Sequence, residues 1–132
     1  MSERMDHIFE SYIEAWNTGN MELLDDITAA DVQRRAGTLD SIDGLDALKG
    51  RMMEFRTAFP DLRLTIRERA YGADFFTCIW NFVGTNTGPG EFPALGKRVD
   101  VTGSTLIRVR DGRMAEEDVY FDTVDFMTQL GA

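Results

Sequence analysis

The sequence predicts an α+β fold in which helices from the first half of the chain pack on one face of a curved antiparallel sheet. Two observations support this fold class. Before residue 60 the apolar residues recur with the 3.6-residue period of amphipathic helices, whereas from residue 62 onward they follow the patterns of strands. Helical and strand patterns that are segregated along a chain are typical of α+β domains. At 132 residues, with no internal repeat and no linker, the chain is expected to form a single domain over residues 1–132.

Three helices are predicted before residue 60. The first ends near Gly19, and its apolar residues fall on one helical face: Ile8, Phe9, Tyr12, Ile13 and Trp16. A short second helix is expected after Asn20, followed by a short strand at residues 32–38. The third helix is predicted from about residue 45 to 59, because its apolar residues are spaced by three and four positions and Pro60 ends it.

Strand patterns begin at Leu62. Leu62, Leu64 and Ile66 alternate with polar residues, as expected for a strand with one buried face and one wet face. Residues 75–83 are apolar on both sides. This pattern predicts a central strand that is covered on both faces.

The remaining elements complete a meander. Residues 84–97 hold four glycines and two prolines and are expected to form a long loop, which could act as a lid. Strands are predicted at 99–109 and 113–122, joined by the hairpin signal at residues 111–112. A closing helical turn is expected over residues 124–130.

Composition excludes several function classes. The formal charge of −9 argues against nucleic acid or an anionic membrane as a partner, since both need basic surfaces. One cysteine, Cys78, cannot form an intrachain disulfide, and one histidine, His7, argues against a multi-His metal site or a Ser-His-Asp triad. No long apolar run or signal-peptide pattern occurs, so a cytoplasmic location is expected. No metal or organic cofactor is implied.

Short segments spread along nearly the whole chain resemble, in order, those of the SnoaL-like polyketide cyclases. They are YIEAWNTG (12–19), AFPDL (58–62), GTNTG (84–88), GKRV (96–99), RVRDGR (108–113), YFD (120–122) and QLG (129–131). The resemblance implies a cone-like nuclear transport factor 2-like fold that encloses a deep, mostly apolar cavity, in a homodimer. Relatives include aldol cyclases, ketosteroid isomerases, epoxide hydrolases and binding domains without catalysis, so the fold alone does not decide the function.

The resemblance assigns a catalytic role to Asp122, which matches the cyclases' acid/base Asp at the end of the last strand. Ring closure by aldol chemistry needs a base and an acid, and a carboxyl group desolvated in an apolar cavity can serve as both. The alternative is that Asp122 caps the following helix. Alternation along the strand places Asp118 and Tyr120 on the face of Asp122 as further cavity residues, unless Asp118 belongs to a solvated acidic stretch.

The chain departs from the family at the positions where cyclases commonly carry His, within residues 32–35 and 84–88. Arg34 or Arg35 could stabilise an enolate there, or the two could be a surface pair, and Asn86 could donate a hydrogen bond to a carbonyl group. Tyr12 is expected to help orient a ligand. Trp16 and Trp80 are expected to belong to the core and to line the cavity.

Two functions follow as hypotheses. The first is a protein that binds a small or mid-sized apolar carbonyl compound and catalyses intramolecular aldol cyclisation with Asp122. The second is a non-catalytic small-molecule-binding or dimeric interaction domain, which the missing histidines favour. Isomerase or epoxide hydrolase chemistry is a further alternative.

Overall fold

The computed structural model describes residues 2–37 and 40–131 and has the α+β architecture predicted from the sequence. Its elements, in chain order, are α1 (Ser2–Thr18), η1 (Met21–Leu23), α2 (Leu24–Ile27), β1 (Thr28–Ala36), β2 (Asp40–Asp43), α3 (Leu45–Ala58), β3 (Arg63–Tyr71), β4 (Phe75–Thr85), β5 (Arg98–Arg110), β6 (Arg113–Phe121) and α4 (Thr123–Leu130). The predicted short strand therefore begins earlier, at Thr28, and residue 38 at its expected end lies outside the described residues. The strand β2 was not predicted.

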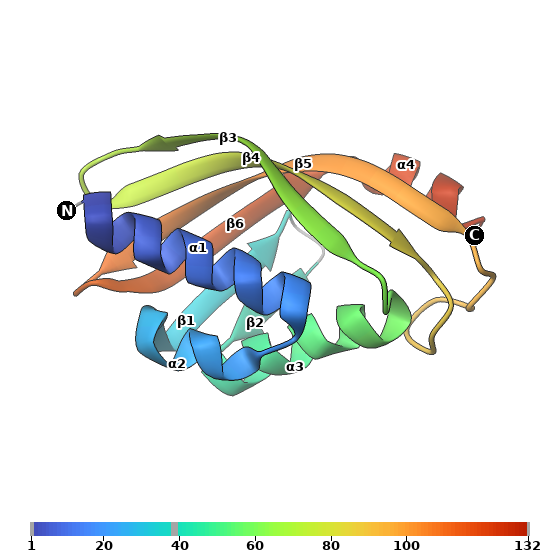
Figure 1. Cartoon of the computed structure of the whole chain (residues 1–132), viewed down its shortest axis with the longest axis horizontal. Helices are drawn as coiled ribbons and strands as arrows, with labels where there is room; N and C mark the ends of the chain where they lie inside the picture. Colours follow the sequence, from blue (N-terminus) through green and yellow to red (C-terminus); the bar gives the residue numbers. More distant parts are fainter. Residues whose placement is uncertain (1, 38–39, 132) are drawn as a thin grey trace.

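The six strands form one sheet in the order β2-β1-β6-β5-β4-β3. The meander from β3 to β6 is antiparallel, as predicted, whereas β1 lies parallel to β6. Asp111 and Gly112 both have positive φ angles, which is the geometry of a tight hairpin turn between β5 and β6. Figure 1 shows the strongly twisted sheet with α1, α2 and α3 gathered on one side of it.

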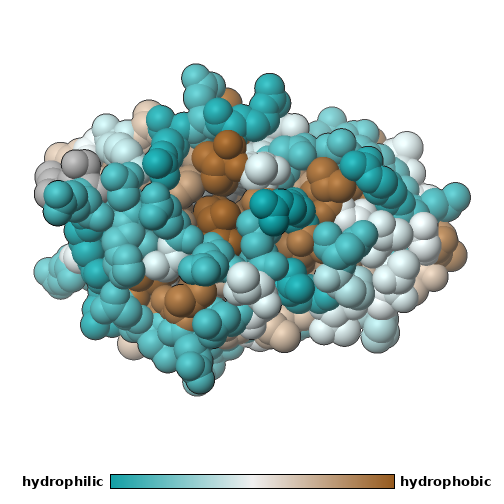
Figure 2. All heavy atoms as spheres, in the orientation of Figure 1, coloured by the Kyte–Doolittle hydropathy of each residue, from teal (hydrophilic) through white to brown (hydrophobic). Residues whose placement is uncertain are grey.

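The hydrophobic core lies between these helices and the inner face of the sheet. The apolar stripe of α1 is buried there, with Met5, Ile8 and Ala15 at most 1% exposed. From the sheet, Phe76 and Ile107 contribute side chains that are at most 2% exposed. On the face seen in Figure 2, hydrophilic side chains cover most of the surface and hydrophobic ones form small separate patches.

The strand β4 differs from its prediction. Its inner side chains, such as Phe76, Cys78 and Trp80, are buried, but Ile79 on the other face is 38% exposed. The apolar pattern on both sides of this strand therefore reflects an inner core face and an outer face that this chain alone does not cover.

The loop between β4 and β5 is tied at its base, because Asn86 N donates to Lys97 O and Gly96 N donates to Asn86 O. Near its middle, Phe92 packs edge-on against Phe126 of α4, with ring centroids 6.1 Å apart. The loop is therefore packed against α4. Among the described residues, no helix is long and apolar enough to cross a membrane.

Candidate functional site

A cavity that opens to solvent lies between α1 and the inner face of the sheet. Its walls are mostly aromatic and aliphatic side chains from α1, the sheet, Phe55 of α3 and Phe126 of α4. The polar exceptions are few. They are Tyr12, Arg34, Thr105 and Glu117, together with the thiol of Cys78.

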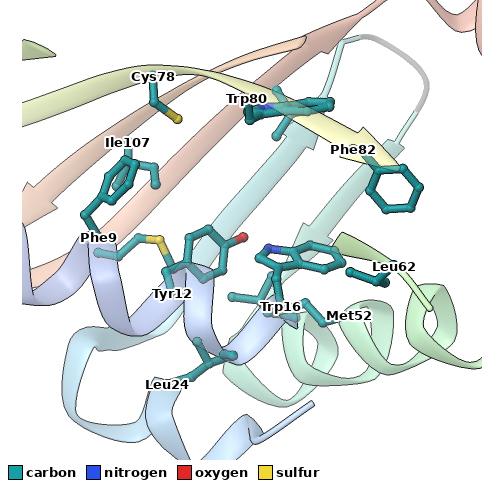
Figure 3. Close-up of a cluster of buried hydrophobic side chains, with 14 of the residues drawn as sticks. Phe9, Tyr12, Trp16, Leu24, Met52, Leu62, Cys78, Trp80, Phe82 and Ile107 are labelled. Atoms are coloured by element: carbon teal, nitrogen blue, oxygen red, sulfur yellow. The ribbon is translucent and has the colours of Figure 1, made fainter. Parts of the chain in front are cut away.

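Strand register arranges the sheet side of this cavity in rows. Phe76, Ile107 and Glu117 are paired across β4, β5 and β6 and form one row. The next row consists of Cys78, Thr105 and Val119, and the third of Trp80, Gly103 and Phe121. Figure 3 shows Cys78 and Trp80 on the sheet side, with Tyr12 and Trp16 of α1 facing them.

A buried polar cluster lies at one point of this apolar wall. The Tyr12 hydroxyl donates to Glu117 Oε1 at 2.5 Å, and Arg34 Nε donates to the same oxygen at 3.1 Å. The side chains of Arg34 and Glu117 are only 11% and 5% exposed. The guanidinium group of Arg34 also lies 6.0 Å from the ring centre of Trp16, within the range of a cation–π contact.

The two oxygens of Glu117 have different surroundings. Oε1 accepts both hydrogen bonds, whereas Oε2 accepts none from the residues that the structure describes. Because Glu117 lines the cavity, Oε2 is the oxygen available to a molecule bound there.

Burial sets the charge states of the two donors. The pKa of Tyr12 is raised well above its ordinary value, mainly by desolvation and secondly by the nearby Glu117 carboxylate. The phenol therefore keeps its proton at neutral pH. Burial alone would lower the pKa of Arg34, but Glu117 and Tyr12 outweigh it and the pKa is raised. The site therefore presents a fixed cation and a neutral phenol beside the Glu117 carboxyl group.

The family model for SnoaL-like polyketide cyclases matches residues 6–130. The chain belongs to the SnoaL-like polyketide cyclase family. No curated protein matches its sequence.

Solved structures of similar shape agree with this family. TsrD from Streptomyces laurentii is 22% identical with a TM-score of 0.88, and the match covers 98% of this chain and 96% of that one. IdmH, a candidate polyketide cyclase from Streptomyces antibioticus, is 25% identical with a TM-score of 0.81, over 98% and 99% of the two chains. A Catenulispora acidiphila protein of ketosteroid isomerase-like fold is 19% identical with a TM-score of 0.78, over 94% and 92%. Together these findings support a cyclase-like or ligand-binding role.

Four residues singled out from the sequence of this SnoaL-like domain line the cavity: Tyr12, Trp16, Arg34 and Trp80. Tyr12 and Trp16 lie on the inward stripe of α1, and Trp80 lies on the inward face of β4. The structure thus brings together the aromatic residues and one of the two arginines.

The other four proposed binding residues do not line it. Arg35 lies on the opposite side of the sheet, 3.7 Å from Glu116 and 3.9 Å from Asp118, and Tyr120 is 61% exposed. Asn86 is buried, but its side-chain amide donates to the carbonyl oxygen of Pro93 and so holds the loop. The expectation that Asp118 and Tyr120 face the cavity is off by one residue in the alternation of β6.

Asp122 also lies outside the cavity, contrary to the expectation from the family resemblance. The strand β6 ends at Phe121, and the exposed Asp122 is the N-cap of α4, where its carboxylate accepts a hydrogen bond of 2.9 Å from Asp125 N. This is the capping alternative weighed from the sequence. A side chain that satisfies the first turn of a helix at the surface is not placed to reach a ligand in the cavity.

Glu117 is the cavity residue that the sequence argument missed. Its strand neighbours at spacing two, Ala115 and Val119, are apolar, and so is Phe121. This apolar set marks the inward face of β6 and places Glu117 on it. The signal was therefore present in the sequence, as one acidic residue within an otherwise apolar alternating series.

Proposed function

We propose that this SnoaL-like domain binds a small or mid-sized apolar carbonyl compound in its cavity and transfers a proton to and from it through Glu117. The observation that carries the proposal is a buried carboxyl group that lines an apolar cavity, with one oxygen bound by Tyr12 and Arg34 and the other without a hydrogen bond from the described residues. Such a group is shielded from water and held in one orientation, as proton transfer at carbon requires.

The proposed reaction starts with enolisation. Glu117 Oε2 takes a proton from the carbon next to the carbonyl group, the C–H bond breaks, and its electron pair moves through the new C=C bond to the carbonyl oxygen. In an intramolecular aldol closure, the enolate carbon then attacks a second carbonyl carbon of the same molecule. The protonated Glu117 returns its proton to the alkoxide that forms, so the enzyme ends in its starting state and no cofactor is consumed.

Tyr12 and Arg34 have distinct roles in this scheme. The cation of Arg34 stabilises the negative charge that develops on the enolate oxygen, and the surrounding aromatic walls strengthen that interaction by excluding water. Tyr12 keeps its proton and donates a hydrogen bond, either to Glu117 or to the ligand oxygen. Both residues also hold Glu117 in position.

The test uses 2-tetralone, a compact apolar ketone with exchangeable protons beside its carbonyl group. In deuterated buffer, proton NMR measures how fast the protein accelerates loss of these protons above the buffer rate. We expect Glu117→Gln to lower the protein-dependent rate by about 10²- to 10⁴-fold, the usual contribution of a general base. Retention of the wild-type rate by a folded Glu117→Gln variant would rule out this role.

Non-catalytic binding is the second candidate. It is favoured by the fact that Tyr12 and Arg34 both donate to the same carboxylate oxygen, an arrangement that satisfies these groups within the protein. Calorimetric binding of 2-tetralone without any acceleration of exchange would select this function over catalysis.

We further propose that the domain forms a homodimer through the outer face of its sheet. Ile79 and Tyr120, both paired with Ser104 across adjacent strands, are 38% and 61% exposed on that face. Large hydrophobic side chains that are exposed on the same face of a sheet are typical of interfaces. Light scattering after size-exclusion chromatography should give a dimer for the wild type and a monomer for Ile79→Glu; a monomeric wild type would exclude the dimer.

A further inference from the structure

A second polar point lies in the cavity at Thr105, one sheet row away from Glu117. Trp80 Nε1 donates to Thr105 Oγ1 at 3.0 Å, so this hydroxyl acts as an acceptor there and keeps its own hydrogen for donation. Thr105 is only 5% exposed, and within the described part of the chain its hydroxyl donates to no other group. The hydrogen of a buried hydroxyl is thus available to an acceptor in the cavity.

Trp80 provides a flat surface beside this hydroxyl. A Cβ atom at Gly103 would lie 2.3 Å from Trp80 Cζ2, so the indole can lie over this position only because residue 103 has no side chain. Figure 3 shows the indole lying along the sheet and facing Tyr12 and Trp16 across the site. A planar ring between these aromatic walls would stack on Trp80.

We propose that Thr105 is a second ligand-binding residue, which donates a hydrogen bond to an oxygen of a flat ligand stacked on Trp80. This inference rests on the proposed function and deepens it, because it requires a ligand with two oxygen functions, one at Glu117 and Arg34 and one at Thr105. Thr105 pairs with Val119, so Glu117 is its diagonal neighbour on β6, with Cα atoms about 7–8 Å apart. We therefore expect the two oxygens of the ligand to lie well apart on the flat molecule.

Two probes test this inference, 2-naphthol with one oxygen and 2,6-dihydroxynaphthalene with oxygens at both ends. The single hydroxyl of 2-naphthol is expected at Glu117, because hydrogen bonds to charged groups are the stronger ones. Thr105→Val removes the hydroxyl with little change in shape, and Thr105→Ser is the matched control that keeps it. Measured by calorimetry, the affinity for 2,6-dihydroxynaphthalene should fall about 3- to 10-fold in Thr105→Val. The affinity for 2-naphthol should change less than about twofold, and Thr105→Ser should bind both probes like the wild type.

Three results would overturn the proposal: an equal loss of affinity for both probes in Thr105→Val, an unchanged affinity for 2,6-dihydroxynaphthalene in that variant, or no binding of either probe to the wild type. If Thr105→Val does not fold, a crystal structure of the wild type with 2,6-dihydroxynaphthalene decides. A probe oxygen about 3 Å from Thr105 Oγ1 supports the proposal, and its absence from that position overturns it.

Different results would refute catalysis by Glu117 and ligand binding by Thr105. A Thr105 effect on the second probe without any exchange of 2-tetralone would refute catalysis by Glu117 and leave the Thr105 site standing. Exchange that depends on Glu117, without a Thr105 effect on the probes, would refute the Thr105 site alone.

Discussion

The buried pair of Arg34 and Glu117 makes a strong prediction about stability. In Arg34→Met, an unbranched apolar side chain replaces the guanidinium group and leaves the carboxyl group of Glu117, whose side chain is 5% exposed, without its cation. Removal of one partner from a buried ion pair typically destabilises a protein by about 3–5 kcal/mol, because an uncompensated charge stays in a poorly solvated place. Tyr12 still donates to Glu117 Oε1 and offsets part of this loss.

A double-mutant cycle separates this loss from simple repacking. Glu117→Gln keeps the shape of the side chain and an oxygen that can accept from Tyr12. In the combined Arg34→Met and Glu117→Gln variant the buried site is neutral, so we expect it to be at least about 1 kcal/mol more stable than Arg34→Met alone.

Urea unfolding, followed by tryptophan fluorescence and circular dichroism at pH 7, gives the four free energies of unfolding. The expected result is a large loss for Arg34→Met and partial recovery in the double variant. Two results would refute the description of these residues as a buried, coupled pair. One is a loss of unfolding free energy below about 1 kcal/mol for Arg34→Met, and the other is a loss in the double variant that equals the sum of the losses in the two single variants.

Three further predictions follow from single side chains. Asp122→Ala should lower the free energy of unfolding by about 1 kcal/mol in urea titrations through loss of the α4 cap, while 2-tetralone binding stays unchanged; weakened binding would contradict its placement outside the cavity. Burial raises the pKa of the Cys78 thiol to about 12, so iodoacetamide at pH 8 should label the folded protein far more slowly than the urea-unfolded protein by mass spectrometry. Equal labelling rates would disprove this shielding. Burial and Glu117 raise the pKa of Tyr12, so above pH 10 the folded state keeps a proton that the unfolded chain loses, and stability falls as pH rises. Unfolding titrations from pH 8 to 11 should show a shallower fall for Tyr12→Phe, and identical slopes would contradict the shift.

The parts of the fold that could be predicted from the sequence are those with strong local signals. The apolar stripe of α1, the stop at Pro60 after α3 and the turn at Asp111 and Gly112 each depend on neighbouring residues. The short strand β2, which pairs with the neighbouring β1, was not predicted. The parallel pairing of β1 with β6 joins segments about 80 residues apart. Such pairings are decided by tertiary packing, which a single sequence shows only faintly.

The same difference between local signals and tertiary packing applies to the cavity residues. Tyr12 and Trp16 could be predicted because they belong to the periodic stripe of α1. On β6, counting the alternation from Asp122 places the even-numbered residues inward, whereas counting from the apolar Val119 and Phe121 places Glu117 inward. A shift of one residue moves every side chain of a strand to the other face. The structure has the second arrangement, which buries the apolar Ala115 and Val119 and leaves Tyr120 exposed. Asp122 lies beyond the end of β6 and caps α4.

In the proposed reaction, the carboxyl group that acts on a bound ketone belongs to Glu117 and not to Asp122. The most direct measurement compares deuterium exchange of 2-tetralone by Glu117→Gln and Asp122→Asn, two variants with the same change from carboxyl to amide. We expect loss of the protein-dependent rate in Glu117→Gln and a rate within about twofold of the wild type in Asp122→Asn. The reverse result, with exchange lost only in Asp122→Asn, would contradict this assignment.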